Sequence, residues 1–286
     1  MIKLIASDMD GTLLNAQMEI PLENIAAIKY AQMNGVEFLV ATGRARKESQ
    51  QILENAGLHT GYINLNGAMV FDTNGKLMVN EPIDRKRAFQ IMDILKKSNC
   101  YFEIVSANDI YSDSRMRRIA NVSDLLVDLN KHLTLKKAVS FAGGSDEVVR
   151  ISFVKNFKSL FDDPNFEVMK FVAFNPAGPA GFREIRHKID NLGNLVTTAS
   201  SSNNLEINNI NAQKGIALLN YAKMRGIDKS EVMAIGDNLN DESMIKLAGV
   251  GVAMDNAVSQ IKNLASFITK NNNDAGVAYA IRHFIK

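Results

Sequence analysis

The chain has 286 residues, of which 46% are hydrophobic and 22% are charged, so it can bury a sizeable core and lacks the composition of a disordered protein. Its 33 basic and 31 acidic residues leave a net charge of +2, which offers no electrostatic footprint for nucleic acid or an anionic membrane. One cysteine, Cys100, and four histidines exclude an intrachain disulfide and a Cys/His zinc cluster. The N-terminal residues lack the regions of a signal peptide and no stretch is apolar enough to span a membrane, so a cytoplasmic protein is expected.

Short apolar runs alternate with helix-like stretches at both ends of the chain, which is the pattern of βαβ units. Strands are expected at 4–6, 36–41, 62–65, 232–235 and 250–253. Helices are expected to begin at Pro21, at about Arg46, and at or near residues 214, 242 and 276. Because the runs are apolar on both faces, they favour parallel strands covered by helices. The predicted fold class is therefore α/β, with a doubly wound, Rossmann-like parallel sheet.

The middle of the chain has a different pattern. A hairpin is expected at 68–79, followed by a helix with apolar residues at Ala88, Ile91, Met92 and Leu95. Strand-like runs follow near 101–105, 150–154, 168–173 and 182–189, and ten of the fourteen phenylalanines lie between residues 83 and 190. We therefore expect residues 83–190 to form an inserted α+β domain within a core domain of residues 1–82 and 191–286.

The most informative residues are Asp8 and Asp10, in the segment Asp8-Met9-Asp10-Gly11-Thr12 after the first apolar run. Side chains on an extended strand repeat every two residues, so both carboxylates would project to one side at the carboxyl end, where open α/β sheets bind ligands. Two carboxylates placed together there need a cation. A calcium loop is excluded because its glycine would come two residues later than Gly11. A turn with two solvated acids is the alternative.

A second acidic cluster, at residues 236–241, directly follows an apolar run. Neighbouring parallel strands would bring Asp237 to the same sheet edge as the first two carboxylates, forming an all-oxygen site suited to magnesium. Asn240 or Asp241 could instead cap the following helix. A cap needs only one of these residues, so their clustering favours a metal site.

Two further segments indicate an anion site. Thr42-Gly43-Arg44 ends an apolar run and supplies a hydroxyl, a glycine that allows close approach, and backbone N–H groups near a helix start. Lys214 lies in the first turn of an expected helix, where the helix dipole disfavours a cation unless a phosphate or a carboxylate is nearby. The alternatives are a simple strand-to-helix connection and a solvated surface lysine.

Together these segments resemble the four motifs of the haloacid dehalogenase superfamily of phosphohydrolases in order, spacing and position at strand ends. The motifs are Asp8-x-Asp10-Gly11-Thr12, Thr42-Gly43-Arg44, Lys214 and Gly236-Asp237-x-x-Asn240-Asp241. The long insertion and the segment Asn64-Leu65-Asn66-Gly67-Ala68 are similar to the Cof-type subgroup, which has a large α/β cap. The resemblance covers essentially the whole chain.

The resemblance implies that Asp8 is the nucleophile, which forms an aspartyl-phosphate, and that Asp10 protonates the leaving alcohol and then activates water. It implies Mg²⁺ as the cofactor, held by Asp8, the backbone carbonyl of Asp10 and Asp237. Asn240 or Asp241 would assist through water or phosphate contacts.

The resemblance also implies that Thr42, the Gly43 backbone, Lys214 and Asn240 bind the phosphate group. Arg44 and Asn66 are further candidates for contact with the substrate or for support of the site. One departure from the family pattern concerns the placement of Lys214. Asn208-Asn209-Ile210-Asn211 replaces a more usual turn with proline and glycine, and a left-handed conformation at Asn211 would make the turn possible.

The inserted domain would act as the cap that selects the leaving group. Its run at 182–189 would place Glu184, Arg186 and Lys188 on one strand face, either toward the substrate or toward solvent. The basic run Arg115-Met116-Arg117-Arg118 is expected on a solvated helix face.

Three functions are compatible with these motifs. The first is a magnesium-dependent phosphatase acting on small phosphorylated metabolites such as sugar phosphates, with neither nucleic acid nor a membrane as partner. The second is a phosphomutase or phosphotransferase that uses the same aspartyl-phosphate, and the third is a non-catalytic protein that binds phosphorylated metabolites. A nucleotide kinase or dinucleotide enzyme is disfavoured, because the sequence has no GxxxxGK[ST] loop and no complete Rossmann fingerprint.

Overall fold

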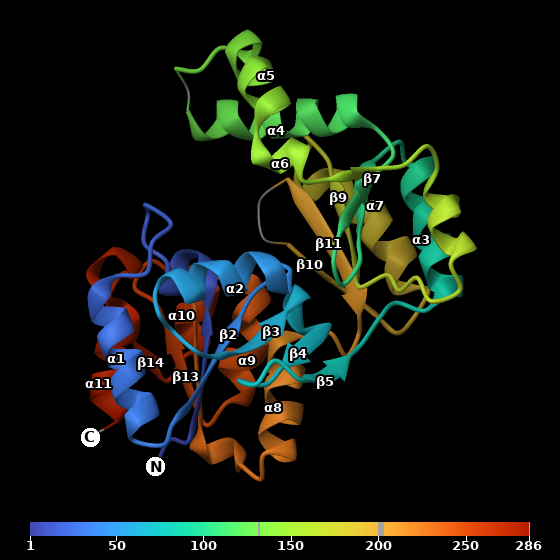
Figure 1. Cartoon of the computed structure of the whole chain (residues 1–286). Coiled ribbons are helices and arrows are strands. Elements are labelled where there is room, and N and C mark those ends of the chain that lie inside the picture. Colours follow the sequence, from blue (N-terminus) through green and yellow to red (C-terminus); the bar gives the residue numbers. More distant parts are fainter. Residues whose placement is uncertain (131, 200–202, 286) are drawn as a thin grey trace. The chain divides into compact units, whose positions relative to one another are not determined.

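The computed structural model describes residues 1–130, 132–199 and 203–285, and they form two compact units (Figure 1). The first unit contains Met1–Pro82, residues 198–199 and residues 208–285. The second unit contains Ile83–Thr197 and residues 203–207. The expected inserted domain ended at residue 190. The structure also groups the described residues 191–197 and 203–207 with it, because two further strands of the second unit follow residue 190.

The first unit is built on an eight-stranded sheet. Its strands, in order across the sheet, are β14 (Phe267–Ile268), β13 (Val250–Ala253), β12 (Val232–Gly236), β1 (Leu4–Asp8), β2 (Glu37–Ala41), β3 (Gly61–Asn64), β4 (Met69–Phe71) and β5 (Leu77–Asn80). The strands from β14 to β3 pair in parallel, and β4 and β5 form the expected antiparallel hairpin beyond them. The predicted α/β class with a parallel-sheet core is confirmed.

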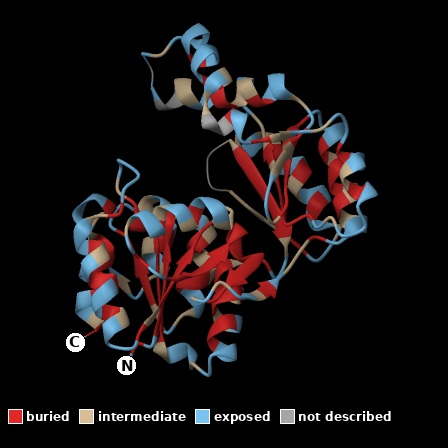
Figure 2. Cartoon of the chain, in the orientation of Figure 1, coloured by how far each residue is buried: buried red, intermediate tan, exposed pale blue. Residues whose placement is uncertain are grey.

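Helices cover both faces of this sheet. They are α1 (Leu22–Met33), α2 (Arg46–Asn55), α8 (Lys214–Met224), α9 (Glu242–Leu247), α10 (Ser259–Leu264) and α11 (Gly276–Phe284). Strands β1, β3 and β12 are buried along their whole length, as expected for parallel strands between helical layers (Figure 2). The helices and strands expected for the first unit are observed within two residues of their expected positions, whereas α10 and β14 were not expected from the sequence. No helix in the described part of the chain is long and apolar enough to cross a membrane.

The order of the strands locates the ligand-binding edge. From β1 the chain moves one way across the sheet to β2 and β3, whereas from β12 it moves the other way to β13 and β14. Because crossovers between parallel strands are right-handed, α1 and α2 cover one face and α9 and α10 the other. The direction reverses between β1 and β12, and open sheets bind ligands at the carboxyl ends of strands at such a reversal.

The second unit has a six-stranded sheet. Its strands, in order across the sheet, are β10 (Leu195–Thr198), β11 (Asn204–Asn209), β9 (Lys170–Phe174), β6 (Tyr101–Val105), β7 (Ile110–Ser112) and β8 (Ser152–Phe153). Its helices are α3 (Arg85–Lys97), α4 (Arg115–Leu129), α5 (Leu135–Gly144), α6 (Asp146–Val149) and α7 (Pro179–Asp190). Phe102, Phe157, Phe171 and Phe182 are buried in one apolar cluster with residues of α3 and α7, so the second unit has its own core.

The strand expected at 182–189 is wrong, because these residues lie in helix α7. The buried positions are Phe182, Ile185 and Ile189, whose spacing of three and four residues is that of a helix and not the alternation of a strand. Glu184 and Lys188 therefore do not share a strand face. They form an ion pair of 2.7 Å one helical turn apart.

Two other expectations for the second unit need correction. The strand expected at 150–154 is limited to Ser152–Phe153. In the basic run of α4, Arg118 is buried and its Nη1 lies 3.0 Å from Glu103 Oε1, so this residue is not on a solvated face. An arginine buried at the sheet is tolerated there because a carboxylate neutralises its charge.

Candidate active site

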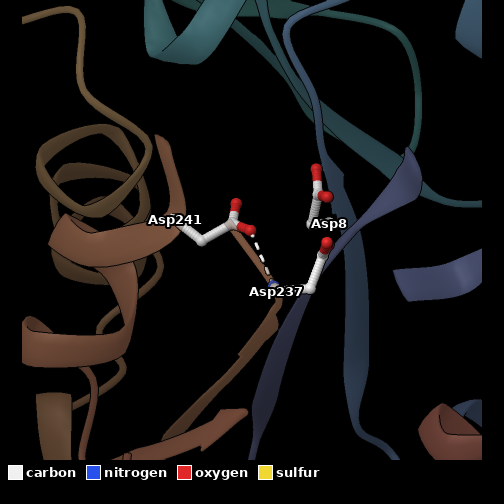
Figure 3. A group of neighbouring side chains, drawn as sticks. All are labelled: Asp8, Asp237 and Asp241. Carbon is white, nitrogen blue, oxygen red and sulfur yellow. Dashed lines mark hydrogen bonds between the residues drawn. The ribbon is translucent and has the colours of Figure 1, made fainter. Parts of the chain in front are cut away.

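The ends of two neighbouring strands bring the acidic motifs together. Asp8 is the last residue of β1, Asp237 directly follows β12, and these strands pair in parallel with Ser7 opposite Ile235. With Asp241, the two aspartates form a group whose carboxylate oxygens lie within 4.8 Å of one another (Figure 3). The structure thus brings Asp8 together with Asp237 and Asp241, which lie more than 220 residues away in the sequence.

Lys214, the first residue of α8, is the cation of this group. Its side chain is fully buried, and Nζ donates to Asp8 Oδ1 and to Asp241 Oδ1, both at 2.6 Å. Burial alone would lower the pKa of Lys214, but the two carboxylates raise it above its ordinary value, so the side chain is an ammonium. The expected counter-charge for this lysine is therefore provided by two carboxylates.

Asp241 shapes the loop that follows β12. Its Oδ2 accepts the backbone N–H groups of Asp237 at 2.9 Å and Asn238 at 3.1 Å, and the first of these bonds is drawn in Figure 3. Asn238 caps the short turn Leu239–Asp241 and Asp241 closes the capping box, whereas no side chain caps α9. The suggestion that Asn240 or Asp241 caps the following helix is wrong, and Asp241 instead fixes the backbone of Asp237.

Thr12 and Gly11 complete the support of Asp237. The buried Thr12 hydroxyl donates to Asp237 Oδ1 at 2.7 Å. Gly11 has a φ of +77°, and a Cβ atom at this position would lie 2.6 Å from Asp237 Oδ2. Both residues belong to the first motif, but the sequence pattern did not indicate a role for either of them. The glycine in the motif was the sequence feature that could have indicated this role. A glycine permits the left-handed backbone at residue 11 and leaves room for the Asp237 carboxylate.

The electrostatics of the site favour a divalent cation. Burial and the charge of Asp241 raise the pKa of Asp8 well above its ordinary value, although Lys214 acts in the opposite direction. Burial and Asp241 also raise the pKa of Asp237 to about 6. Three carboxylates therefore share one ammonium group, and a cation between Asp8 and Asp237 would relieve this repulsion. Carboxylate oxygens are the ligands that magnesium prefers, so the residues fit this ion.

The carboxylate of Asp10 lies apart from this acidic group. Its Oδ1 and Oδ2 accept from Arg44 Nη2 at 2.5 Å and Nε at 2.9 Å, a bidentate pair. The Asp10 side chain is 48% exposed, so this carboxylate faces solvent, while Asp8 is buried. The two expected catalytic acids thus have different surroundings, which suits two different roles. Of the Asp10 atoms, the backbone carbonyl remains the expected metal ligand.

The loop after β2 places the second motif. Thr42 is buried, its Oγ1 accepts the N–H of Arg44 at 3.1 Å, and its carbonyl accepts the N–H of Asn66 at 3.0 Å. Gly43, between Thr42 and Arg44 in the chain, is partly exposed. Asn66 is buried with a φ of +60°, so this expected site residue is part of the turn that supports the loop.

Asn240 offers a further oxygen at the site. It lies in the turn Leu239–Asp241, and its side-chain Oδ1 is buried and accepts no hydrogen bond from the described residues. A buried acceptor without a donor is costly, so a water molecule or a ligand group is expected to donate to it.

The turn before Lys214 has a different structure from the one expected. Asn211 does not have a left-handed backbone. Instead, Asn209 holds the turn, because its Oδ1 accepts the N–H of Asn211 at 3.0 Å and its Nδ2 donates to the Pro82 carbonyl at 2.8 Å. Side-chain hydrogen bonds of this kind replace proline and glycine in fixing a turn. Lys214 follows this turn as the first residue of α8.

Comparisons with known proteins agree with these motifs. A family model described as haloacid dehalogenase-like hydrolase matches residues 5–281. Phosphatase YwpJ of Bacillus subtilis is 36% identical over 289 residues, which cover 99% of this chain and 100% of the relative. The 5-amino-6-(5-phospho-D-ribitylamino)uracil phosphatase YwtE of the same organism is 31% identical, over 98% of this chain and 97% of the relative.

The fold is also shared with solved structures. The solved structure of a haloacid dehalogenase-like hydrolase from B. subtilis matches this chain with a TM-score of 0.84 and a sequence identity of 34%. The match covers 99% of this chain and 100% of the B. subtilis chain. The match extends over both units, so it includes the inserted one. The chain therefore belongs to the Cof-type haloacid dehalogenase-like hydrolases and is a phosphatase, a phosphoric monoester hydrolase, of that family.

Proposed function

We propose that the chain hydrolyses small phosphorylated metabolites in a magnesium-dependent reaction, through a phosphoryl group carried on Asp8. One observation carries the proposal. A buried carboxylate at the end of a central strand lies 2.6 Å from a buried ammonium group and within 4.8 Å of a second strand-end carboxylate. This arrangement combines a nucleophile, a cation for phosphoryl oxygens and a metal ligand.

In the first half of the reaction, a carboxylate oxygen of Asp8 attacks the phosphorus atom. The bond between phosphorus and the ester oxygen breaks, and Asp10 gives its proton to the leaving alkoxide. The products are the free alcohol and a phosphoryl group on Asp8. Splitting one displacement into two steps lowers each barrier, and a positioned proton donor contributes about 10²- to 10⁴-fold.

In the second half, Asp10 is a carboxylate and removes a proton from a water molecule. The water oxygen attacks phosphorus, and the bond to Asp8 breaks. Inorganic phosphate leaves, Asp8 regains its carboxylate and Asp10 its proton. The solvent exposure of Asp10 supports this role, because the water must reach it.

The groups that would hold magnesium are the carboxylates of Asp8 and Asp237 and the backbone carbonyl of Asp10. Thr12 orients Asp237 through its side chain, and Asp241 through its N–H. When bound by these residues, the metal would supply positive charge that offsets the charge of the phosphoryl oxygens. Asn240 Oδ1 is positioned in the same loop to accept from a bound water.

Lys214 and the Thr42 loop would bind the phosphoryl oxygens. Lys214 Nζ already contacts Asp8, so it lies beside the atom that receives the phosphoryl group. The Gly43 backbone and the Thr42 hydroxyl would supply further donors at the end of β2, the strand next to β1. Positive charge and backbone N–H groups together stabilise the charge of the transition state.

We propose phosphate monoesters of sugars or sugar alcohols as the substrate class. The relative YwtE, which is 31% identical, is named as a phosphatase of 5-amino-6-(5-phospho-D-ribitylamino)uracil, whose phosphate is carried on a chain derived from a sugar alcohol. The second unit would be the cap that selects the leaving group, as in the expected domain organisation.

The test compares the wild-type chain with Asp8→Asn on p-nitrophenyl phosphate, with magnesium and with a chelator. We expect Asp8→Asn to lower kcat by more than about 10³-fold, because the amide is not a nucleophile. The chelator should abolish wild-type turnover. The assay measures both nitrophenolate and free inorganic phosphate, so that transfer to another acceptor would be detected.

Asp255→Asn is the matched control. Asp255 is an exposed aspartate that pairs weakly with Lys262 at 3.5 Å and has no part in the acidic group. This variant should retain wild-type turnover. Activity in a folded Asp8→Asn protein would refute the aspartyl-phosphate, and activity without metal would refute the magnesium requirement.

A further inference from the structure

Three asparagine side chains hold consecutive parts of the turn that carries Asp10. Asn256 Nδ2 donates to the Gly11 carbonyl at 2.7 Å, Asn24 Nδ2 donates to the Leu13 carbonyl at 3.2 Å, and Asn272 Nδ2 donates to the Leu14 carbonyl at 2.8 Å. None of these asparagines belongs to the four motifs. The turn is thus held from outside by residues that lie 11, 245 and 258 positions from their acceptors in the sequence.

The asparagines are themselves oriented by hydrogen bonds. Asn256 Oδ1 accepts the N–H of Asn272 at 3.0 Å, and Asn24 Oδ1 accepts the N–H of Ala278 at 2.9 Å. Each of these two amides therefore uses both its oxygen and its nitrogen. An amide held at both ends fixes the direction of the carbonyl that it binds.

Of the three asparagines, Asn256 binds the carbonyl that is nearest to Asp10 along the chain. Its acceptor is the carbonyl of Gly11, the residue after Asp10, and Gly11 has a left-handed backbone at which the chain turns. Since the Asp10 carboxylate is half exposed, few packing contacts restrain it, and its position depends on the backbone of Asp10 and Gly11 and on the pair with Arg44. A small rotation of this turn would move the proton donor away from the ester oxygen.

We infer that Asn256 is a positioning residue for the acid/base chemistry of Asp10, an inference that rests on the proposed function. Among the described residues, Asn256 forms no hydrogen bond with the acidic group or with Lys214, so it acts through the Gly11 carbonyl. Its hydrogen bond determines where Asp10 presents its proton. Misplacement of a catalytic group by about 1 Å can cost about 100-fold in rate.

The test measures kcat/KM of Asn256→Ala on two substrates that differ in their need for a proton. Nitrophenolate leaves readily without one, whereas phenolate from phenyl phosphate is a poorer leaving group and gains more from the acid. For Asn256→Ala we expect a loss of about tenfold or more on phenyl phosphate and of less than about threefold on p-nitrophenyl phosphate. Because kcat/KM reports the steps up to departure of the leaving group, slow hydrolysis of the intermediate does not affect it.

The ratio of the two values is independent of the folded fraction, since both are measured on one sample. Asn256 is exposed, so its truncation leaves no cavity in the core. Asn273→Ala is the matched control, because Asn273 Oδ1 accepts the N–H of Ala16 at 2.8 Å, beyond the turn. This control should keep the wild-type ratio, and Asp10→Asn should show the same selective loss as Asn256→Ala, but larger.

The outcomes separate the inference from the proposed function. An equal loss on both substrates, or no loss, in Asn256→Ala would overturn the positioning role while Asp10→Asn still showed the selective loss. If Asp10→Asn itself showed no selective loss, or if Asp8→Asn remained active, the proposed function would fail and the inference with it.

Discussion

At the scale of single residues, Gly11 shows how closely the backbone and the site are linked. The glycine adopts a φ of +77° and leaves room for Asp237 Oδ2, which would be 2.6 Å from a Cβ atom. The same glycine carbonyl accepts from Asn256. One residue without a side chain therefore turns the chain, makes space for an expected metal ligand and provides an anchor.

We expect Gly11→Ala to lower kcat/KM by more than about tenfold, because the new methyl group displaces Asp237. Gly35→Ala is the control, since Gly35 has nearly the same φ, +76°, with no atom within 4 Å of the added Cβ. Both variants should lose about 1 kcal/mol from the left-handed backbone, measured by urea unfolding. Equal activity in the two variants would contradict the role of the contact with Asp237.

At the scale of elements, capping residues define the ends of helices that periodicity only locates approximately. Helix α3 begins after Asp84, whose side chain accepts the N–H of Arg87 at 3.0 Å. Slight burial would raise the pKa of Asp84, but the hydrogen bonds and charge of Arg87 lower it below its ordinary value. The ionised carboxylate is thus the form that stabilises the helix.

We expect Asp84→Ala to destabilise the start of α3 by about 1 kcal/mol, detected as faster hydrogen exchange of the first amides of the helix. Because the pKa of Asp84 is lower in the folded chain, this contribution is present above about pH 4 and is lost as pH falls through the folded pKa. Asp93→Ala, which removes only the exposed pair with Lys97, should have a smaller effect. Equal exchange rates in the two variants would contradict the capping role.

At the scale of the whole molecule, the near-neutral net charge of +2 conceals a concentrated acidic site. Without metal, the pKa of Asp237 is raised to about 6 by burial and by Asp241, above its value in an unfolded chain. Between about pH 4 and pH 6 the folded chain therefore binds more protons than the unfolded chain at this residue. The contribution of Asp237 to the free energy of unfolding of the metal-free protein therefore falls as pH rises through this range.

We expect Asp237→Asn to be more stable than the wild type at pH 7.5 in the presence of a chelator, with the difference shrinking toward pH 5. Magnesium should raise the Tm of the wild type more at pH 7.5 than at pH 5, because the metal binds the ionised carboxylates. It should raise the Tm of Asp237→Asn much less. Thermal unfolding at both pH values, with and without the ion, measures these differences, and a wild type more stable than Asp237→Asn without metal would reverse the sign.

Local sequence patterns predicted the α/β class, the helices and strands of the first unit other than α10 and β14, and the residues of the acidic motifs. These features were predictable because the strands are continuous apolar runs and because Asp8, Asp10 and Asp237 lie at or just beyond their carboxyl ends. In the second unit, the run Phe182–Ile189 combines alternating charges with helical spacing of its apolar residues. Whether this run forms a helix or a strand depends on which of its side chains pack into the core of the second unit. The local alternation of charges does not show which side chains these are.

The contacts that hold the site are between segments far apart in the chain and could not be predicted from local patterns. The contacts of Lys214 with Asp8 and Asp241, of Thr12 with Asp237 and of Asn256 with Gly11 join residues 27 to 245 positions apart. Such pairings depend on the order of strands in the sheet and on turns such as the one held by Asn209. Local patterns specify which side chains reach the edge of the sheet, but hydrogen bonds between distant segments fix their positions and their charges.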